Sequence, residues 1–112
     1  MCLFCKIVGR QIPSDIVLET DDVLAFKDVR PMAPVHVLVI PKKHLESLHD
    51  SVPGDAALLG HMLIAAREVA DKLGLGAPGY RVVFNIGQDA GQSVLHLHLH
   101  VLGGRALAWP PG

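Results

Sequence analysis

Residues 95–101 alternate strictly between an apolar residue and a histidine, in the order Leu95-His96-Leu97-His98-Leu99-His100-Val101. Successive side chains of a β-strand point to opposite faces of its sheet. The pattern therefore predicts a strand over residues 95–102, with its apolar side chains in a core and all three histidines on the other face. Such a row requires a sheet with one apolar face and one face that gathers imidazoles.

The rest of the chain predicts the elements of that sheet and two helices. Apolar spacing indicates a short helix over residues 2–9 and a long helix over 55–73, with Asp55 as its cap and Gly74 as its terminator. Strands are expected over residues 16–19, 23–28, 35–40 and 80–86. A chain of 112 residues corresponds to one domain, so we expect a single α+β domain spanning 1–112, with the long helix on an antiparallel sheet.

Charge and hydropathy exclude several classes of protein. The formal net charge is −1 and no basic block occurs, which argues against binding to nucleic acid. Apolar runs such as residues 35–40 are too short to cross a membrane, and the N-terminal residues do not resemble a signal peptide. Cys2 and Cys5, three positions apart, suggest a metal or redox pair in a reducing compartment. We therefore expect a soluble, cytoplasmic protein.

The histidine row admits three interpretations: a solvated strand face, a metal site, or nucleophilic catalysis at phosphorus. Two of the row's histidines could contribute to a catalytic zinc, which usually has three protein ligands. A neutral imidazole can also attack phosphorus, form a covalent intermediate and be displaced by water. The adjoining loop over residues 87–93 contains Gly87, Gly91 and Ser93, which would let backbone N–H groups approach an anion. That loop favours catalysis.

Several motifs together resemble the histidine triad (HIT) family, and within it the Hint branch of purine nucleoside phosphoramidases. The matching segments are residues 25–29, 34–44, 91–94, 96–102 and 103–112. The resemblance implies the HIT fold, which is a five-stranded antiparallel sheet with one long helix and a short N-terminal helix. It also implies a homodimer in which sheets and long helices meet across a two-fold axis. The implied activity is hydrolysis of adenosine or guanosine 5′-monophosphoramidates through a nucleotidyl-His98 intermediate.

The resemblance also assigns roles to individual residues. His98 matches the nucleophile, His100 lies against the phosphate, and Ser93 assists the leaving group. The implied catalytic residues are His98, His100, His96, His36 and Ser93. Asp28 matches the ribose ligand, and the implied nucleotide-binding residues are Asp28, Val29, Phe4, Ile7, Leu3, Phe26, Asn85, Gly91, Gln92, Ser93, His98 and His100. Ala90 departs from the Hint pattern, which often has glycine there, and would be strained at positive φ.

The Cys2-x-x-Cys5 pair is a second departure, because typical Hint phosphoramidases lack it. It resembles the zinc site of other HIT proteins and of galactose-phosphate uridylyltransferases, which implies Cys2, Cys5, His44 and His96 as ligands. Two thiolates and two imidazoles suit a closed structural zinc, so catalysis itself would require no cofactor. The alternative is a pair of free thiols. His49 and His61 match no motif, so we interpret them as structural or solvated.

Three other functions remain open from the sequence. A dinucleoside polyphosphate hydrolase would belong to the neighbouring branch of the family, and the ending over residues 109–112 favours Hint. A nucleotide-binding or scaffold protein with incidental hydrolase activity would gain nothing from His98. A zinc hydrolase that uses the histidine row directly would lose all activity on chelation. For the favoured function the expected partner is a purine nucleotide.

Overall fold

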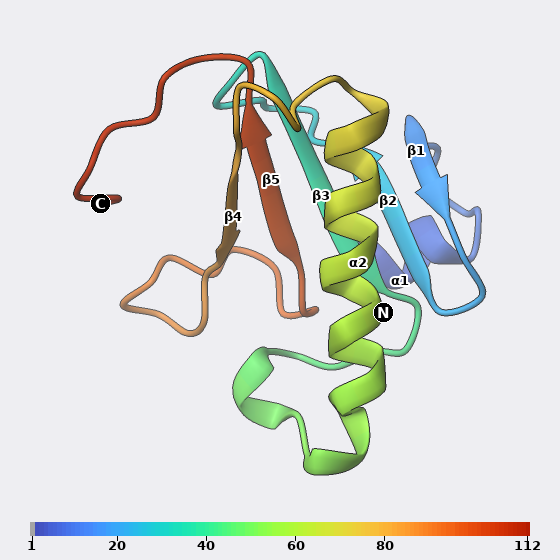
Figure 1. The fold of residues 1–112 in the computed structure, drawn as a ribbon. Helices are drawn as coiled ribbons and strands as arrows, with labels where there is room; N and C mark the ends of the chain where they lie inside the picture. Colours follow the sequence, from blue (N-terminus) through green and yellow to red (C-terminus); the bar gives the residue numbers. More distant parts are fainter. Residues whose placement is uncertain (1) are drawn as a thin grey trace.

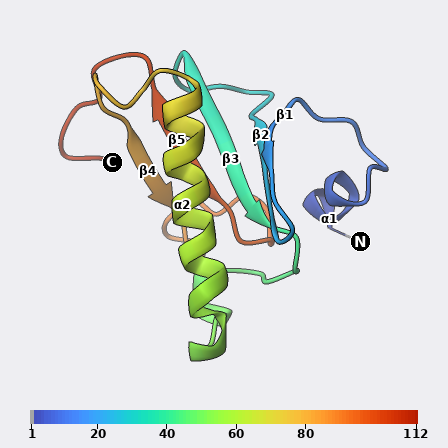
Figure 2. The same cartoon turned by 45° about the vertical axis from the view of Figure 1, so that its right-hand side comes forward.

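The computed structural model describes residues 2–112 and contains a five-stranded antiparallel sheet with a helix on each face (Figures 1 and 2). The strands are β1 (Ile16–Glu19), β2 (Val23–Lys27), β3 (Val35–Pro41), β4 (Arg81–Phe84) and β5 (Leu99–Gly103). The helices are α1 (Leu3–Val8) and α2 (Ala56–Lys72), with 3-10 turns at Leu48–Asp50 and Pro53–Asp55. The strand order β1-β2-β3-β5-β4 inserts the last strand between β3 and β4. This is the expected HIT fold.

Alternation along the strands divides the apolar residues between two cores. The larger core lies between α2 and the sheet and contains Val23, Ala25, Val37, Val39, Met62, Ala65, Ala66, Val69, Ala70, Leu97, Leu99 and Val101. The smaller core lies under α1 on the opposite face and contains Phe4, Ile7, Leu24, Phe26, Leu38 and Ile40. Figure 2 shows α1 on the opposite side of the strands from α2. Because His36 and His100 lie on the α1 face, this short helix covers the face that carries the histidines.

The long helix begins and ends close to the predicted residues. Gly74 has φ +76° immediately after the helix, as its role as terminator requires. The side chain of Asp55 does not cap α2 as expected: it accepts hydrogen bonds from Val52 N and Lys43 Nζ, both at 3.0 Å. The hydrogen bond from the Val52 backbone, followed by that from Lys43, lowers the pKa of this carboxyl. Within residues 2–112, no helix combines the length and apolar character needed to cross a membrane.

The predicted strand over residues 95–102 is wrong at its start, since β5 begins at Leu99. Leu97 N donates to Leu45 O at 2.6 Å instead of joining a strand ladder, and Leu95 is 62% exposed instead of lying in the core. The side-chain alternation nevertheless persists in part, because Leu97, Leu99 and Val101 are buried in the α2 core. An irregular segment therefore carries His96 and His98, and a strand carries His100.

Candidate active site

A pocket of about 320 Å³ opens on the α1 face of the sheet. It is lined by Leu3, Phe4, Ile7, Ile12, Pro13, Ser14, Phe26, Lys27, Asp28, Val29, Leu38, Ser93, Val94, His98 and His100. The histidines and Ser93 come from β5 and the segment before it, whereas the apolar residues come mainly from α1, β2 and the connection that follows α1. The pocket therefore combines apolar side chains with a few polar groups, as in many small-ligand sites.

The backbone determines which nitrogen of His98 is free. The ring Nδ1 lies 2.7 Å from the carbonyl oxygen of His96, and a carbonyl can only accept, so Nδ1–H donates. In the neutral ring, Nε2 then keeps its lone pair. His98 is 4% exposed and lies at the pocket wall, where Phe4 packs edge-on against it with ring centroids 5.2 Å apart. The hydrogen bond to His96 O thus fixes the orientation of the ring, with Nε2 as its free nitrogen.

His36 and His100 form a second directed chain of hydrogen bonds. Met32 N donates to His36 Nδ1 at 3.0 Å, so neutral His36 carries its proton on Nε2. That Nε2–H donates to His100 Nδ1 at 2.8 Å, which leaves the proton of His100 on its own Nε2. Burial lowers the pKa of both rings, and that of His100 falls to about 4 with further contributions from His98 and His36. His100 is therefore a neutral hydrogen-bond donor at the pocket.

The same hydrogen bonds argue against a metal ion held by the histidine row itself. Asp28, His36 and His100 are close enough together to hold an ion, and Asp28 Oδ2 lies 3.4 Å from His36 Nε2. A metal ligand needs a lone pair. His36 Nε2 carries the proton, and moving that proton to Nδ1 would break the bond from Met32 N. His36 and His100 are therefore organised to donate hydrogen bonds through Nε2–H rather than to bind a metal.

The glycine-bearing loop before the histidines is held by Gln92. Its amide oxygen accepts from Gly87 N at 2.9 Å, and its amide nitrogen donates to Glu46 O at 2.6 Å and Val94 O at 3.0 Å. Gly87 and Gly91 have φ values of +79° and +78°, which only glycine adopts readily. Among the residues described, Arg10 is the only non-glycine with positive φ, so the alanine at position 90 is unstrained.

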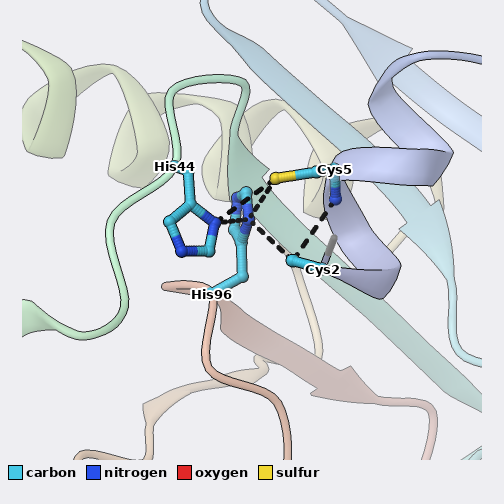
Figure 3. Close-up of side chains that lie close together, drawn as sticks. All are labelled: Cys2, Cys5, His44 and His96. Atoms are coloured by element: carbon cyan, nitrogen blue, oxygen red, sulfur yellow. Dashed lines mark hydrogen bonds between the residues drawn. The ribbon is translucent and has the colours of Figure 1, made fainter.

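Beside the pocket, Cys2, Cys5, His44 and His96 converge on a common point (Figure 3). Three distances join Sγ to Nδ1: 3.3 Å for Cys2–His96, 3.3 Å for Cys5–His44 and 3.6 Å for Cys5–His96. The two Nδ1 atoms are 3.1 Å apart. Tetrahedral zinc, with bonds of about 2.3 Å to sulfur and 2.0–2.1 Å to nitrogen, would place S and N about 3.6 Å apart and two N atoms about 3.3 Å apart. The four donors therefore fit a zinc ion.

The orientation of His96 supports this fit. Its Nε2 lies 2.8 Å from Pro41 O, so Nε2–H donates and Nδ1 is left with the lone pair. Nδ1 is the atom that faces the two thiols and His44 (Figure 3). A histidine that binds a metal usually donates its other ring N–H to an acceptor such as a backbone carbonyl, and this hydrogen bond fixes which nitrogen faces the metal. Figure 3 also shows that His44 and the Cys2–Cys5 segment approach His96 from separate parts of the chain.

Most of the residues predicted for the site lie together. Of the expected nucleotide-binding residues, the pocket wall contains Leu3, Phe4, Ile7, Phe26, Asp28, Val29, Ser93, His98 and His100. It does not contain Asn85, Gly91 or Gln92, which belong to or adjoin the supporting loop. Sequence reasoning missed Ile12, Pro13, Ser14, Lys27, Leu38 and Val94. Only Leu38 had a usable signal, because it alternates with His36 on the same strand.

His49 and His61 lie away from both groups of histidines. His61 Nδ1 is 2.5 Å from Asp22 Oδ2 on the outside of α2, and His49 is exposed in a 3-10 turn. The hydrogen bond from His61 lowers the pKa of Asp22.

The fold and the site together define a small α+β protein with a covered histidine row at the wall of a pocket. The HIT domain model matches residues 9–107, and the chain belongs to this family. An uncharacterised HIT-like protein, slr1234 from Synechocystis sp., is 58% identical over 110 residues, which are 98% of this chain and 96% of that protein. The crystal structure of a HIT family hydrolase from Legionella pneumophila Philadelphia 1 matches with TM-score 0.98 at 50% identity, covering all of both chains.

A more distant relative carries a more specific description. The crystal structure of a histidine triad nucleotide-binding protein from Candida albicans matches with TM-score 0.83 at 36% identity, covering 98% of this chain and 83% of that one.

Proposed function

We propose that the protein is a hydrolase of adenosine or guanosine 5′-monophosphoramidates that acts through a nucleotidyl-His98 intermediate. The observation that carries this proposal is the hydrogen bond from His98 Nδ1–H to His96 O, because it leaves Nε2 as a neutral nucleophile in the pocket. The hydrolase description of the Legionella relative and the nucleotide-binding description of the Candida relative support it.

The first step forms a bond between His98 Nε2 and phosphorus and breaks the bond from phosphorus to nitrogen. The leaving amine takes a proton that solvent supplies through the Ser93 hydroxyl, which lies on this wall. The imidazole becomes positively charged, and the His96 carbonyl, which already accepts from Nδ1–H, stabilises that charge without rearrangement. In the second step water attacks phosphorus and releases a proton to solvent, the bond from phosphorus to His98 Nε2 breaks, and His98 leaves as a neutral ring with its lone pair restored.

The other pocket residues bind the nucleotide in the proposed complex. His100 Nε2–H donates to a phosphoryl oxygen, and His36 keeps His100 in the required tautomer. Asp28 accepts from the ribose hydroxyls, because one carboxylate can accept two hydrogen bonds. The purine lies among the apolar side chains of α1 and β2, namely Leu3, Phe4, Ile7 and Phe26, with Val29 at the rim. Gly91 and Gln92 belong to the loop that would contact the phosphate, and Asn85 lies two residues before that loop.

Two structural properties belong to the same proposal. Cys2, Cys5, His44 and His96 would hold a structural zinc, which when bound fastens the N-terminal segment to the sheet. The protein would also be a cytoplasmic homodimer that joins through α2 and the edge strand β4. The exposed apolar side chains Leu63, Ile64 and Val82 support such an interface, since they are 51%, 52% and 37% exposed. A solution mass of twice one chain would confirm the dimer.

The test is turnover of three substrates: an adenosine phosphoramidate, a guanosine phosphoramidate and a diadenosine polyphosphate. We expect both phosphoramidates to be preferred by at least tenfold in kcat/KM. Rapid quenching in denaturant at alkaline pH, where a histidine phosphoramidate survives, followed by mass spectrometry should detect a nucleoside monophosphate adduct on the peptide that contains His98. Preference for the polyphosphate would assign the neighbouring branch of the family. Binding of AMP without turnover of any of the three would indicate a binding protein.

A further inference from the structure

Helix α1 contributes to both the pocket and the four-residue cluster. Cys2 precedes the helix and Cys5 lies within it, whereas Leu3, Phe4 and Ile7 line the pocket. The helix has six residues, and an isolated helix of that length is unstable in water. Its position must therefore come from contacts with the rest of the molecule.

Those contacts are made by side chains. The backbone hydrogen bonds that the structure records for residues 2–12 all stay within that segment, for example Gln11 N to Lys6 O at 2.9 Å. Phe4 and Ile7 are 4% and 7% exposed and pack into the smaller core. Arg10 pairs with Glu19 at the surface, where an ion pair contributes little. Val8 and Ile12 pack at the edge of that core, and beyond these apolar contacts Cys2 and Cys5 join α1 to the sheet through the cluster.

Phe4 touches residues of both sites. Its ring lies edge-on to His96 of the cluster with centroids 5.9 Å apart, and edge-on to His98 of the pocket with centroids 5.2 Å apart. It also contacts Phe26 at 5.6 Å on the pocket wall. Contacts of this kind are directional, so a shift of α1 that moves Phe4 alters the wall of the pocket as well.

We propose that metal occupancy of the Cys2–Cys5–His44–His96 cluster sets the affinity of the pocket for purine nucleotides, with Phe4 joining the two sites. This inference takes one thing from the proposed function, namely that the ligand of the pocket is a purine nucleotide. When the four ligands are tied together, α1 is held in place before the nucleotide arrives. Without that connection, binding must order α1 at a cost in free energy, and the affinity falls.

The residues that would act on the phosphate lie outside α1, so metal occupancy should change nucleotide binding and not the rate of the bound reaction. His100 belongs to β5, His98 lies in the segment before it, and Asp28 directly follows β2. Once the nucleotide is bound and α1 is ordered, the same groups face the phosphate whether or not metal is present. We therefore expect a change in KM and in nucleotide Kd, with kcat altered less than threefold. Coupling between sites is also reciprocal, so the nucleotide must raise metal affinity by the same factor.

The experiment compares AMP binding to the zinc-loaded and the chelator-treated full-length chain by calorimetry. We expect the zinc-free protein to bind AMP at least tenfold more weakly. In the reciprocal measurement, saturating AMP should raise the affinity for zinc by the same factor in competition with a chelator. Equal AMP affinities, with no effect of AMP on zinc, would overturn the coupling. Failure of both forms to bind AMP would instead overturn the proposed function.

Two variants separate coupling from general loss of structure. Phe4→Leu keeps all four ligands and an apolar side chain, and should reduce the zinc-dependent ratio of AMP affinities to below threefold. An unchanged ratio would remove Phe4 from the coupling. His61→Ala changes an exposed histidine outside both sites and should leave zinc content and AMP affinity as they are. Circular dichroism shows whether the chelator-treated chain stays folded, and unfolding on removal of zinc would overturn the proposal, because the metal would then stabilise the whole fold and not α1 alone.

Discussion

His96 and His98 are two residues apart in one irregular segment, yet they present opposite ring nitrogens. His96 donates Nε2–H to Pro41 O and turns Nδ1 towards the cysteines, whereas His98 donates Nδ1–H to His96 O and leaves Nε2 at the pocket. In each case a backbone carbonyl determines the tautomer. Identical side chains therefore acquire different chemistry from the direction of one hydrogen bond.

The two groups also differ in how they are assembled. His98 and His100 of the pocket, with His36 behind them, belong to the centre of the sheet. His36 lies on β3, His100 lies on β5, and His98 lies just before β5. The cluster brings the start of the chain, the segment after β3 and His96 to one point (Figure 3). The pocket chemistry is thus part of the sheet, while the cluster fastens a segment onto it. Loss of either should have distinct consequences.

The largest expected effect follows from removing His98. His98→Ala should lower kcat by at least about 10³-fold while leaving AMP affinity within about tenfold, because it removes a bond made only during reaction. Steady-state kinetics and calorimetry measure the two quantities. His61→Ala is the matched control and should retain full turnover. Retention of more than a few per cent of activity by His98→Ala would disprove the covalent mechanism.

Removing a cluster thiol should chiefly affect stability. Cys5→Ser should lose stoichiometric zinc and lower the melting temperature by about 8 °C, which corresponds to about 2 kcal/mol, while kcat changes less than threefold. Metal analysis, calorimetric melting and turnover at saturating substrate are the measurements. His49→Ala, at an exposed histidine in a 3-10 turn, should retain its zinc. A wild-type chain purified without zinc would identify the cysteines as free thiols.

The sequence predicted the elements and most of the residues that lie together at the pocket and the cluster, but not which nitrogen of each histidine ring carries the proton. The alternation over residues 95–101 correctly predicted burial of Leu97, Leu99 and Val101, since strand periodicity depends on neighbouring residues only. It could not predict that Leu97 N bonds to Leu45 O, which ends the ladder at Leu99. The sequence could not predict the tautomer of His96 either, because the carbonyl that faces its ring lies 55 residues away in sequence.

Gln92 offers a way to disturb the pocket without the cluster. Its amide makes three hydrogen bonds that hold the loop before Ser93, so Gln92→Ala leaves Gly87 N and two carbonyls without this partner. We expect kcat/KM to fall about tenfold, roughly 1.4 kcal/mol, with zinc content unchanged. Gln88→Ala, at an exposed position in the same loop, is the control. A loss of zinc in Gln92→Ala would show that the loop supports both groups.

The smallest effect concerns protonation of His100. Burial, followed by the adjacent His98 and His36, lowers the pKa of His100 to about 4, and Asp28 has a smaller opposing effect. In the unfolded chain the pKa of histidine is about 6.5, so between pH 6.5 and 4 the unfolded state binds the proton first. His100 therefore makes the free energy of unfolding decrease as pH falls through this window and has no such effect above it.

His100→Gln isolates that contribution, because protonation of the cluster affects the wild type and the variant alike. Urea unfolding at pH 7 and pH 5 should show the wild type losing about 1 kcal/mol more than His100→Gln, a value reduced for the part of the ring that solvent reaches. Equal losses would mean that His100 takes up a proton in the folded protein near its ordinary pKa. His100 would then be a charged donor at the phosphate, and the contrast between the two histidine groups would extend to charge as well as to tautomer.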